Sequence, residues 1–105
     1  MKKGDVVLIK FPFTDLSGSK LRPALVLIET GNDVLVAFIT SVLSEKFTGD
    51  VSLVKSVENG LKKDSVLRLS KLATLSKELI AGKIGNFTTE ELTKVNRGLR
   101  EIFQI

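Results

Sequence analysis

Short segments rich in β-branched and aromatic residues, each followed by a cluster of turn-forming residues, fill the first two-thirds of this chain. Such segments favour strands, because branched and aromatic side chains pack well on a pleated, half-buried surface. Five segments have this character, and they are residues 5–13, 21–29, 34–40, 50–54 and 65–72. Five short strands predict a small, strongly bent antiparallel sheet or barrel.

The sequence changes character after these segments and predicts helices. Residues 76–81 predict a short helix that Gly82 stops. Thr88 and Glu91 have the spacing of a capping box, which marks the start of a helix. Apolar residues then recur at helical spacing, at Leu92, Val95, Leu99, Ile102 and Phe103. We therefore expect a mainly β fold with added helices (α+β), in which a bent antiparallel barrel carries a C-terminal helix, in one domain spanning residues 1–105.

Four residue types that many active sites need are missing from the chain, namely Cys, His, Tyr and Trp. Their absence excludes disulfides, thiol nucleophiles, serine–histidine triads and metal sites built on Cys or His. Any chemistry must come from hydroxyl, carboxyl, amide or cationic side chains, or from the backbone. No apolar run is long enough for the core of a signal peptide or for a membrane span, so we expect a soluble cytoplasmic protein.

The net charge of +4 is distributed unevenly along the chain. Residues 1–22 and residues 62–72 each carry an excess of three positive charges, whereas residues 23–61 between them carry an excess of three negative charges. If the two basic segments meet in space, they form one positive face of the kind that binds a polyanion. A net charge of +4 is also ordinary for a small soluble domain, so the pattern leaves both interpretations open.

Four short motifs occur in an order that resembles one known family. They are Gly-Asp at residues 4–5, Arg-Pro-Ala-Leu-Val at residues 22–26, Ile-Thr-Ser at residues 39–41 and Asp-Ser-Val-Leu-Arg-Leu at residues 64–69. Together they resemble the MazF/PemK toxins of type II toxin–antitoxin systems. The resemblance implies an SH3-like barrel, usually a homodimer. It also implies a sequence-specific, metal-independent endoribonuclease that arrests growth, needs no cofactor and is neutralised by a cognate antitoxin.

The resemblance also implies roles for individual residues. Arg22, from the Arg-Pro motif, and Thr40, from the Ile-Thr motif, match the catalytic pair of many family members. Arg68 matches an arginine of the fifth strand that takes part in the PemK-like branch. That branch places an Asp where this chain has Ser70 and uses a His in the first loop, while many members have an Arg where this chain has Ala73. The version of the site built on Arg22 and Thr40 therefore matches this sequence better than the version that uses an Asp and a His.

The implied chemistry suits a chain without His or Cys, because RNA carries its own nucleophile, the 2′-hydroxyl. A guanidinium can bind two phosphate oxygens in a fork and stabilise the charge that develops during attack. We expect the RNA to be bound by Ser19, Lys20, Ser41 and Arg68. Asp15 and Asp64 are the loop carboxylates that could act as the general base.

Two other function classes remain open at this stage. The same small basic barrel could be a non-catalytic module that binds RNA or protein, in which case the arginines would only hold phosphates. It could also be a gyrase poison, as are some relatives that share the implied fold. Besides single-stranded RNA, the expected partner is an antitoxin whose acidic or amphipathic peptide covers the basic face. The Lys62–Lys63 pair is expected to be a solvated turn.

Overall fold

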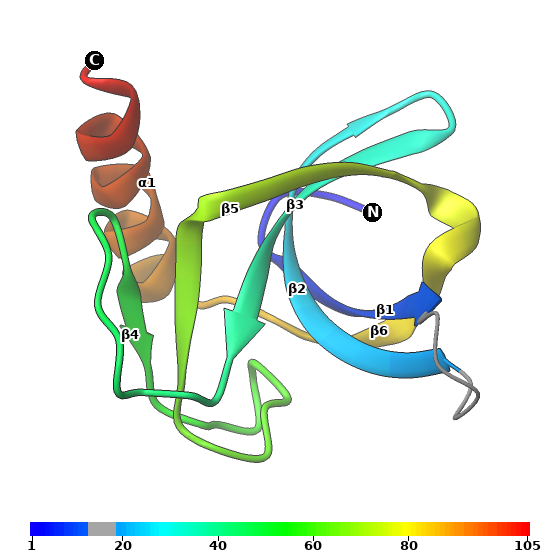
Figure 1. The fold of residues 1–105 in the computed structure, drawn as a ribbon, viewed down its shortest axis with the longest axis horizontal. Coiled ribbons are helices and arrows are strands. Elements are labelled where there is room, and N and C mark those ends of the chain that lie inside the picture. The colour runs from blue at the N-terminus through cyan, green and yellow to red at the C-terminus, as the bar shows by residue number, and fades with distance from the viewer. Residues whose placement is uncertain (13–18) are drawn as a thin grey trace.

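Six antiparallel strands and one C-terminal helix make up the fold, which a computed structural model describes for residues 1–12 and 19–105 (Figure 1). The elements are β1 (Asp5–Pro12), β2 (Ser19–Thr30), β3 (Asp33–Thr40), β4 (Val51–Leu53), β5 (Ser65–Ser76), a 3-10 helix η1 (Lys77–Leu79), β6 (Ile80–Asn86) and α1 (Thr89–Phe103). The strands form a single sheet in the order β4-β5-β3-β2-β1-β6. The sheet is strongly curved, and within the described residues no ladder joins β4 to β6, so the barrel is not closed by hydrogen bonds.

The expected mainly β fold with a C-terminal helix is confirmed, and all five predicted strands are present. The prediction of a short helix over residues 76–81 is wrong. Only Lys77–Leu79 form a helical turn, after Ser76 accepts a hydrogen bond from the backbone N–H of Glu78. The chain then enters β6, which runs through Gly82 and pairs with β1. Pairing with β1 overrides the weak local signal, because strand propensity depends on what lies beside the strand.

Both faces of the central strands are buried, which explains why their sequences are almost continuously apolar. Neighbouring residues of β1 and β2 point to opposite faces, as the two-residue period of a strand requires. Val6 and Leu25 belong to an apolar cluster that also contains Val95 of α1. Val7 and Val26 belong to a second cluster, which η1 and the start of β6 help to cover. The fold therefore has two apolar layers on one curved sheet.

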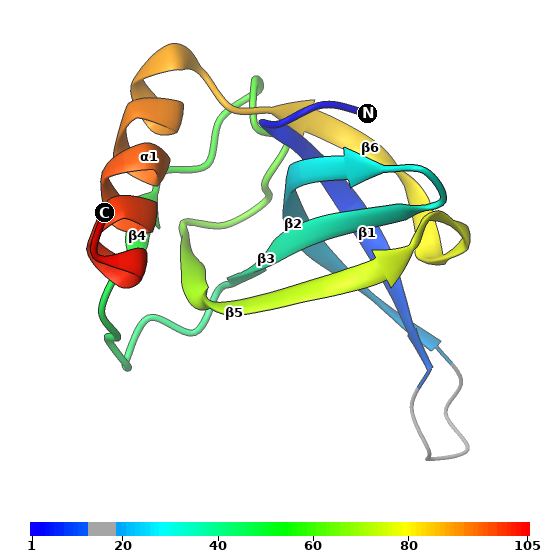
Figure 2. The same ribbon diagram turned by 90° about the horizontal axis from the view of Figure 1, so that it is seen from above.

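A large irregularity in the β3–β5 ladder bends β5. Ala37 pairs with Leu72, but the next residue, Phe38, pairs with Arg68, so residues 69–71 of β5 have no partner on β3. Extra residues on one strand bend that strand and increase its twist. The bend separates two parts of β5, and only the first part also pairs with β4. Figures 1 and 2 show α1 packed beside β4 at this end of the sheet.

The helix begins with the predicted capping box, in which Thr88 and Glu91 exchange side-chain to backbone hydrogen bonds. Its apolar stripe packs on the sheet through Leu92, Val95, Leu99 and Ile102. Gly98 is buried where α1 passes the Gly49 backbone. Among the described residues, no helix is long and apolar enough to cross a membrane.

Replacing Gly98 by alanine should destabilise the protein, although alanine favours helices by about 1 kcal/mol over glycine. A Cβ at position 98 would lie 2.6 Å from Leu69 Cδ1 and 2.8 Å from the carbonyl oxygen of Gly49. Because that oxygen belongs to the backbone, the helix must shift, and overpacking of this kind costs about 1–3 kcal/mol. We expect a lower urea midpoint for Gly98→Ala. Lys94→Ala, at an exposed position of α1, is the control, and a Gly98→Ala protein as stable as the wild type would contradict the close packing.

Asp5 ties β1 to β6 through a buried carboxylate. Its Oδ1 lies 3.1 Å from Lys83 Nζ on β6, and its Oδ2 accepts a hydrogen bond of 3.0 Å from the backbone N–H of Lys2. Burial acts to raise the pKa of Asp5, but the Lys2 N–H and the Lys83 ammonium outweigh burial, so the pKa of Asp5 is lowered. The ionised form is therefore the one that stabilises the fold.

This lowered pKa predicts the direction of a pH effect on stability. Ionised Asp5 contributes to the free energy of unfolding. This contribution is fully present above the unfolded-state pKa of about 3.9 and is lost as the pH falls through the lower folded-state pKa. We expect the wild type to exceed Asp5→Asn in free energy of unfolding by a constant amount between about pH 5 and pH 7, and by less below about pH 4. Denaturant unfolding of both proteins across this range measures the difference. An advantage that grows on acidification would contradict the assignment.

Candidate functional site

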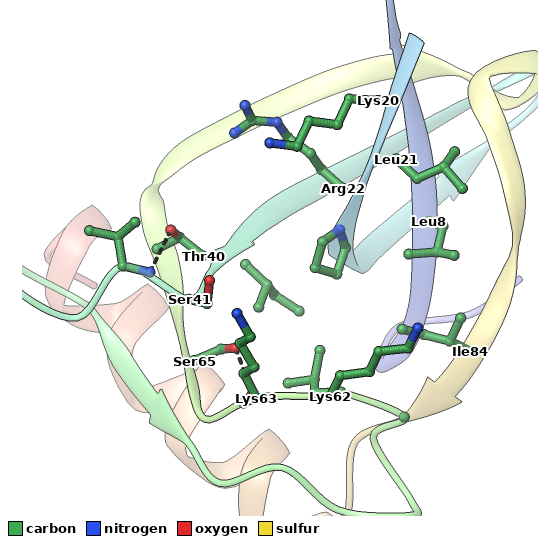
Figure 3. A pocket seen from close by; sticks show the side chains of 15 residues that line it. Leu8, Lys20, Leu21, Arg22, Thr40, Ser41, Lys62, Lys63, Ser65 and Ile84 are labelled. Carbon is green, nitrogen blue, oxygen red and sulfur yellow. Dashed lines mark hydrogen bonds between the residues drawn. The ribbon is translucent and has the colours of Figure 1, made fainter.

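A pocket of about 640 Å³ opens where the start of β2, the end of β3 and the loop between β4 and β5 come together (Figure 3). We call it the basic pocket, and its lining residues are Leu8, Lys20, Leu21, Arg22, Pro23, Ile39, Thr40, Ser41, Val42, Gly60, Leu61, Lys62, Lys63, Ser65 and Ile84. Its volume lies within the range of about 300–1,000 Å³ that is typical of ligand sites.

Four cationic side chains line the basic pocket, and the described lining includes no carboxylate. Lys20 and Arg22 come from the first basic segment of the sequence, and Lys62 and Lys63 come from the second. The two basic segments therefore do meet in space. A concave surface lined by one sign of charge concentrates ions of the opposite sign. The pocket is suited to an anionic ligand.

Strand geometry brings the Arg-Pro and Ile-Thr motifs to the same pocket. The β2–β3 ladder ends at the pair of Ala24 and Phe38. Continuing that register two residues further would set Arg22 across from Thr40, and both side chains line the pocket. Proline has no N–H with which to extend the ladder, so Pro23 helps the two strands part at this point. The pocket opens between the separated strand ends.

The hydroxyl of Thr40 is held in a defined position. Its Oγ1 accepts a hydrogen bond of 3.1 Å from the backbone N–H of Val42 (Figure 3). A threonine hydroxyl has one hydrogen to donate, and this contact leaves that hydrogen available for another acceptor. Thr40 is half-buried, and Ser41 beside it is exposed. The end of β3 therefore offers hydroxyl donors to a ligand that Arg22 could also reach.

The loop that carries Lys62 and Lys63 is held in place by Asn59, whose side chain is fully buried. The Asn59 Oδ1 accepts hydrogen bonds of 3.0 Å from the backbone N–H groups of Ser56 and Leu61. Its Nδ2 donates to the carbonyl oxygen of Val54 at 2.9 Å and to Oε2 of Glu91 at 3.0 Å. These contacts connect the loop to the capping box of α1.

Gly60 and Ser65 complete the support of this loop. Gly60 has a φ of +70°, and a Cβ there would overlap the backbone of Ile84 on β6, so only glycine fits. The hydroxyl of Ser65 donates a 2.9 Å hydrogen bond to the carbonyl oxygen of Lys63. The pair Lys62–Lys63 was expected to be a solvated turn. Both side chains are exposed, but they stand on an ordered loop that forms one wall of the pocket.

Four of the six predicted site residues line the basic pocket, and they are Arg22, Thr40, Lys20 and Ser41. Ser19 begins β2, but its side chain lies outside the part of the structure that is described. Arg68 does not line the pocket, because its side chain is buried elsewhere, under the loop between β3 and β4. The structure thus brings together the Arg22–Thr40 version of the site and leaves Arg68 out of it.

Arg68 holds the β3–β4 loop through several contacts of its guanidinium group. It donates to both carboxylate oxygens of Asp50, through Nε at 3.3 Å and Nη2 at 3.2 Å. Nη2 also donates to the carbonyl oxygen of Glu45 at 3.1 Å, and the guanidinium carbon lies 4.4 Å from the centre of the Phe47 ring. A bidentate pair with a carboxylate is among the stronger polar contacts in proteins.

The structure describes one of the two candidate general bases, Asp64, and that residue does not line the basic pocket. Asp15 lies outside the described residues. Asp64 is exposed, does not line the pocket, and accepts a 3.0 Å hydrogen bond from the backbone N–H of Lys55. Across residues 1–12 and 19–105, no three His, Cys, Asp or Glu side chains are grouped so that they could hold a metal ion.

Lys62 and Lys63 are the cationic pocket residues that were not among the predicted site residues. The uneven charge distribution was the one signal for them, because they open the second basic segment. Charge distribution along a sequence does not show which basic segments meet, so it could not place these two side chains opposite Arg22.

Comparisons with solved structures show the same fold in Mycobacterial endoribonucleases and in a Mycobacterium tuberculosis toxin. An endoribonuclease from a Mycobacterial species, solved in complex with its cognate antitoxin, superposes with a TM-score of 0.77 at 18% identity, over 100% of this chain and 96% of that one. An endoribonuclease from a Mycobacterial species superposes with a TM-score of 0.75 at 17% identity, and the match covers 100% of this chain and 92% of that one. The Mycobacterium tuberculosis toxin MazF-mt6 superposes with a TM-score of 0.74 at 19% identity, and the match covers 94% of this chain and 97% of that one. A search of curated proteins found no match.

The sequence itself matches a family model over residues 2–103, a span that includes every residue lining the basic pocket. That model describes PemK-like, MazF-like toxins of type II toxin–antitoxin systems. The fold, the Arg-Pro and Ile-Thr motifs and the pocket that unites them agree with this match. The chain therefore belongs to the family of PemK-like, MazF-like toxins of type II toxin–antitoxin systems.

Proposed function

We propose that this toxin is a sequence-specific endoribonuclease that cuts single-stranded RNA without a metal ion or other cofactor. The observation that carries the proposal is the meeting of Arg22 and Thr40 in a pocket lined by four cations. Membership of the toxin family and the similar folds of Mycobacterial endoribonucleases support it. Single-stranded RNA suits the site, because a phosphate backbone that is not paired in a helix can enter a pocket.

The proposed reaction uses the nucleophile that RNA itself supplies. The 2′-oxygen forms a bond to the adjacent phosphorus while the bond from phosphorus to the 5′-oxygen of the next nucleotide breaks. The products are a 2′,3′-cyclic phosphate and a 5′-hydroxyl, and solvent water accepts the proton of the 2′-hydroxyl and supplies one to the 5′-oxygen. Arg22 binds the phosphate oxygens, on which negative charge develops, and the Thr40 hydroxyl donates to one of them.

The described pocket lining holds no carboxylate. We therefore assign two roles to the protein, which are to align the reacting groups of the RNA and to stabilise the negative charge that develops on the phosphate. An arginine remains protonated near neutral pH and is a poor base. Holding the reacting groups in line and stabilising charge can each lower the barrier by several kcal/mol. We expect a slow enzyme whose activity depends on Arg22 more than on any described carboxylate.

The remaining parts of the proposal concern partners and location. A cognate antitoxin, contributing an acidic or amphipathic segment, would cover the basic pocket and block RNA. The Mycobacterial structure with its cognate antitoxin supports such a partner. A homodimer in the cytoplasm is proposed from the family resemblance.

The proposed function is tested with antitoxin-free, folded protein and a long, unstructured RNA in the presence of EDTA. We expect cuts at a small set of sites that share a short sequence. The products should carry 2′,3′-cyclic phosphate and 5′-hydroxyl ends. Intact RNA would refute the nuclease and favour a binding module. Trapped gyrase complexes in a DNA-supercoiling assay would instead indicate a gyrase poison.

A further inference from the structure

Three cations of the basic pocket, Lys20, Lys62 and Lys63, have no part in the proposed reaction, and two of them stand together on the loop between β4 and β5. Lys62 and Lys63 stand on the side of the opening that faces Lys20 and Arg22, with Thr40 and Ser41 on a third side (Figure 3). Arg22 and Thr40 act on one phosphate, the one that is cut. A second pair of cations on the opposite wall raises the question of what these two lysines bind.

The wall that carries Lys62 and Lys63 is built as a fixed part of the site. Asn59 bonds to three backbone groups of its own loop and also to Glu91 of α1. The Ser65 hydroxyl binds the carbonyl oxygen of Lys63 itself. The loop backbone that carries the two lysines is therefore fixed, so this backbone does not have to be ordered when an anion binds, which lowers the entropy cost of binding. A solvated surface turn would not need this network.

The surface between the two pairs of cations is largely apolar. Leu8, Ile39, Leu61 and Ile84 line it. A nucleotide has an apolar, flat base between charged phosphates. The volume of about 640 Å³ is enough for one small molecule and too small for a folded partner. A single RNA nucleotide therefore fits the pocket in size and in the arrangement of charge.

We propose that Lys62 and Lys63 form a second phosphate-binding position for the same RNA strand. They hold the phosphate next to the one that Arg22 and Thr40 bind, and the base between the two phosphates packs on the apolar surface. This inference rests on the proposed function and deepens it. The second position aligns the strand and adds affinity, and it does not contact the reacting phosphate.

Binding of RNA that cannot be cut tests the second position separately from catalysis. The probe is a random-sequence pool of short single-stranded RNA with 2′-fluoro riboses, which lack the nucleophile. We compare the wild type, Lys62→Gln/Lys63→Gln and the control Lys71→Gln/Lys94→Gln, which removes two exposed charges outside the pocket. We expect about tenfold weaker binding by the first variant only, since it loses charge-assisted contacts to phosphate. The slope of log Kd against log salt should also fall by about 0.7 for the lost phosphate.

Cleavage kinetics then place the two lysines relative to the reacting phosphate. With a cleavable RNA, Lys62→Gln/Lys63→Gln should raise KM about tenfold and leave kcat within about twofold, because it removes binding shared by the ground and transition states. A fall in kcat as large as that of Arg22→Ala would overturn the proposal, because the lysines would then act on the phosphate that is cut.

The outcomes distinguish the two proposals. Equal RNA affinity for the two lysine double variants would overturn the second phosphate position and leave the nuclease intact. A wild type that binds RNA through Lys62 and Lys63 but never cuts it would refute the nuclease and keep the binding position. A wild type that binds no RNA would overturn both.

Discussion

Replacing Arg22 by alanine is expected to lower the rate of RNA cleavage by about 10²–10³-fold, which is the usual effect of losing one donor aimed at developing charge. Arg22 lines the basic pocket and is exposed, so its loss should leave the free energy of unfolding within about 0.5 kcal/mol of the wild type. The loss should appear in kcat, because the guanidinium binds the transition state more strongly than the ground state. Single-turnover cleavage of a short RNA that spans a mapped site measures it.

Arg22→Lys is the matched control for this prediction. Lysine keeps the positive charge but loses the planar fork that binds two phosphate oxygens. We expect its activity to fall between those of the wild type and Arg22→Ala. Equal cleavage by the wild type and Arg22→Ala, from preparations free of other nucleases, would show that Arg22 is not catalytic. A large loss of thermal stability in Arg22→Ala would show that its role is structural.

Replacing Arg68 by methionine is expected to have the opposite pattern, with a large effect on stability. Arg68 is 6% exposed and forms a bidentate pair with Asp50, whose side chain is 13% exposed. Removing one partner of a buried ion pair leaves the other charge uncompensated and costs about 3–5 kcal/mol. The contact with the Phe47 ring is lost as well. Urea unfolding of Arg68→Met should show this loss directly.

A double variant tests whether the cost comes from the Asp50 charge. Asp50→Asn removes the charge but keeps an oxygen that can accept the 2.9 Å hydrogen bond from the Phe47 N–H. Arg68→Met/Asp50→Asn should therefore recover part of the stability lost by Arg68→Met. If the double variant is no more stable than the single one, the ion pair does not explain the effect.

Cleavage by Arg68→Met separates the structural role from the family-implied role in RNA binding. At a temperature at which the variant is folded, we expect kcat within about tenfold of the wild type, since Arg68 lies outside the pocket. A loss as large as that of Arg22→Ala would mean that Arg68 reaches the RNA after all. Both arginines lie on strands, but we expect replacement of Arg22 to lower activity and replacement of Arg68 to lower stability.

Sequence motifs and structure agree best at Arg22 and Thr40. The Arg-Pro motif lies near the start of β2 and the Ile-Thr motif ends β3, and both strands were predicted from their own residues. The pairing of β2 with β3 then brings the two motifs together. For Arg68 the motif gave a role, but no local pattern indicated that Asp50, 18 positions earlier, would bind its guanidinium. An ion pair between β5 and the loop that precedes β4 depends on the path of that loop and on the bend in β5, which the amino-acid order alone does not reveal.

Local patterns in the amino-acid sequence were enough to predict five strands and the capped terminal helix, and the motifs were enough to indicate the family to which the chain belongs. These features depend on neighbouring residues, whose period and turn chemistry can be recognised locally. Three features became visible in the folded chain alone: residues 80–86 form β6, Arg68 is buried against Asp50, and Lys62 and Lys63 line the same pocket as Arg22. Each of these features depends on contacts between segments that are far apart in the sequence. Such contacts form, and stabilise the fold, only after the curved sheet has brought the segments together.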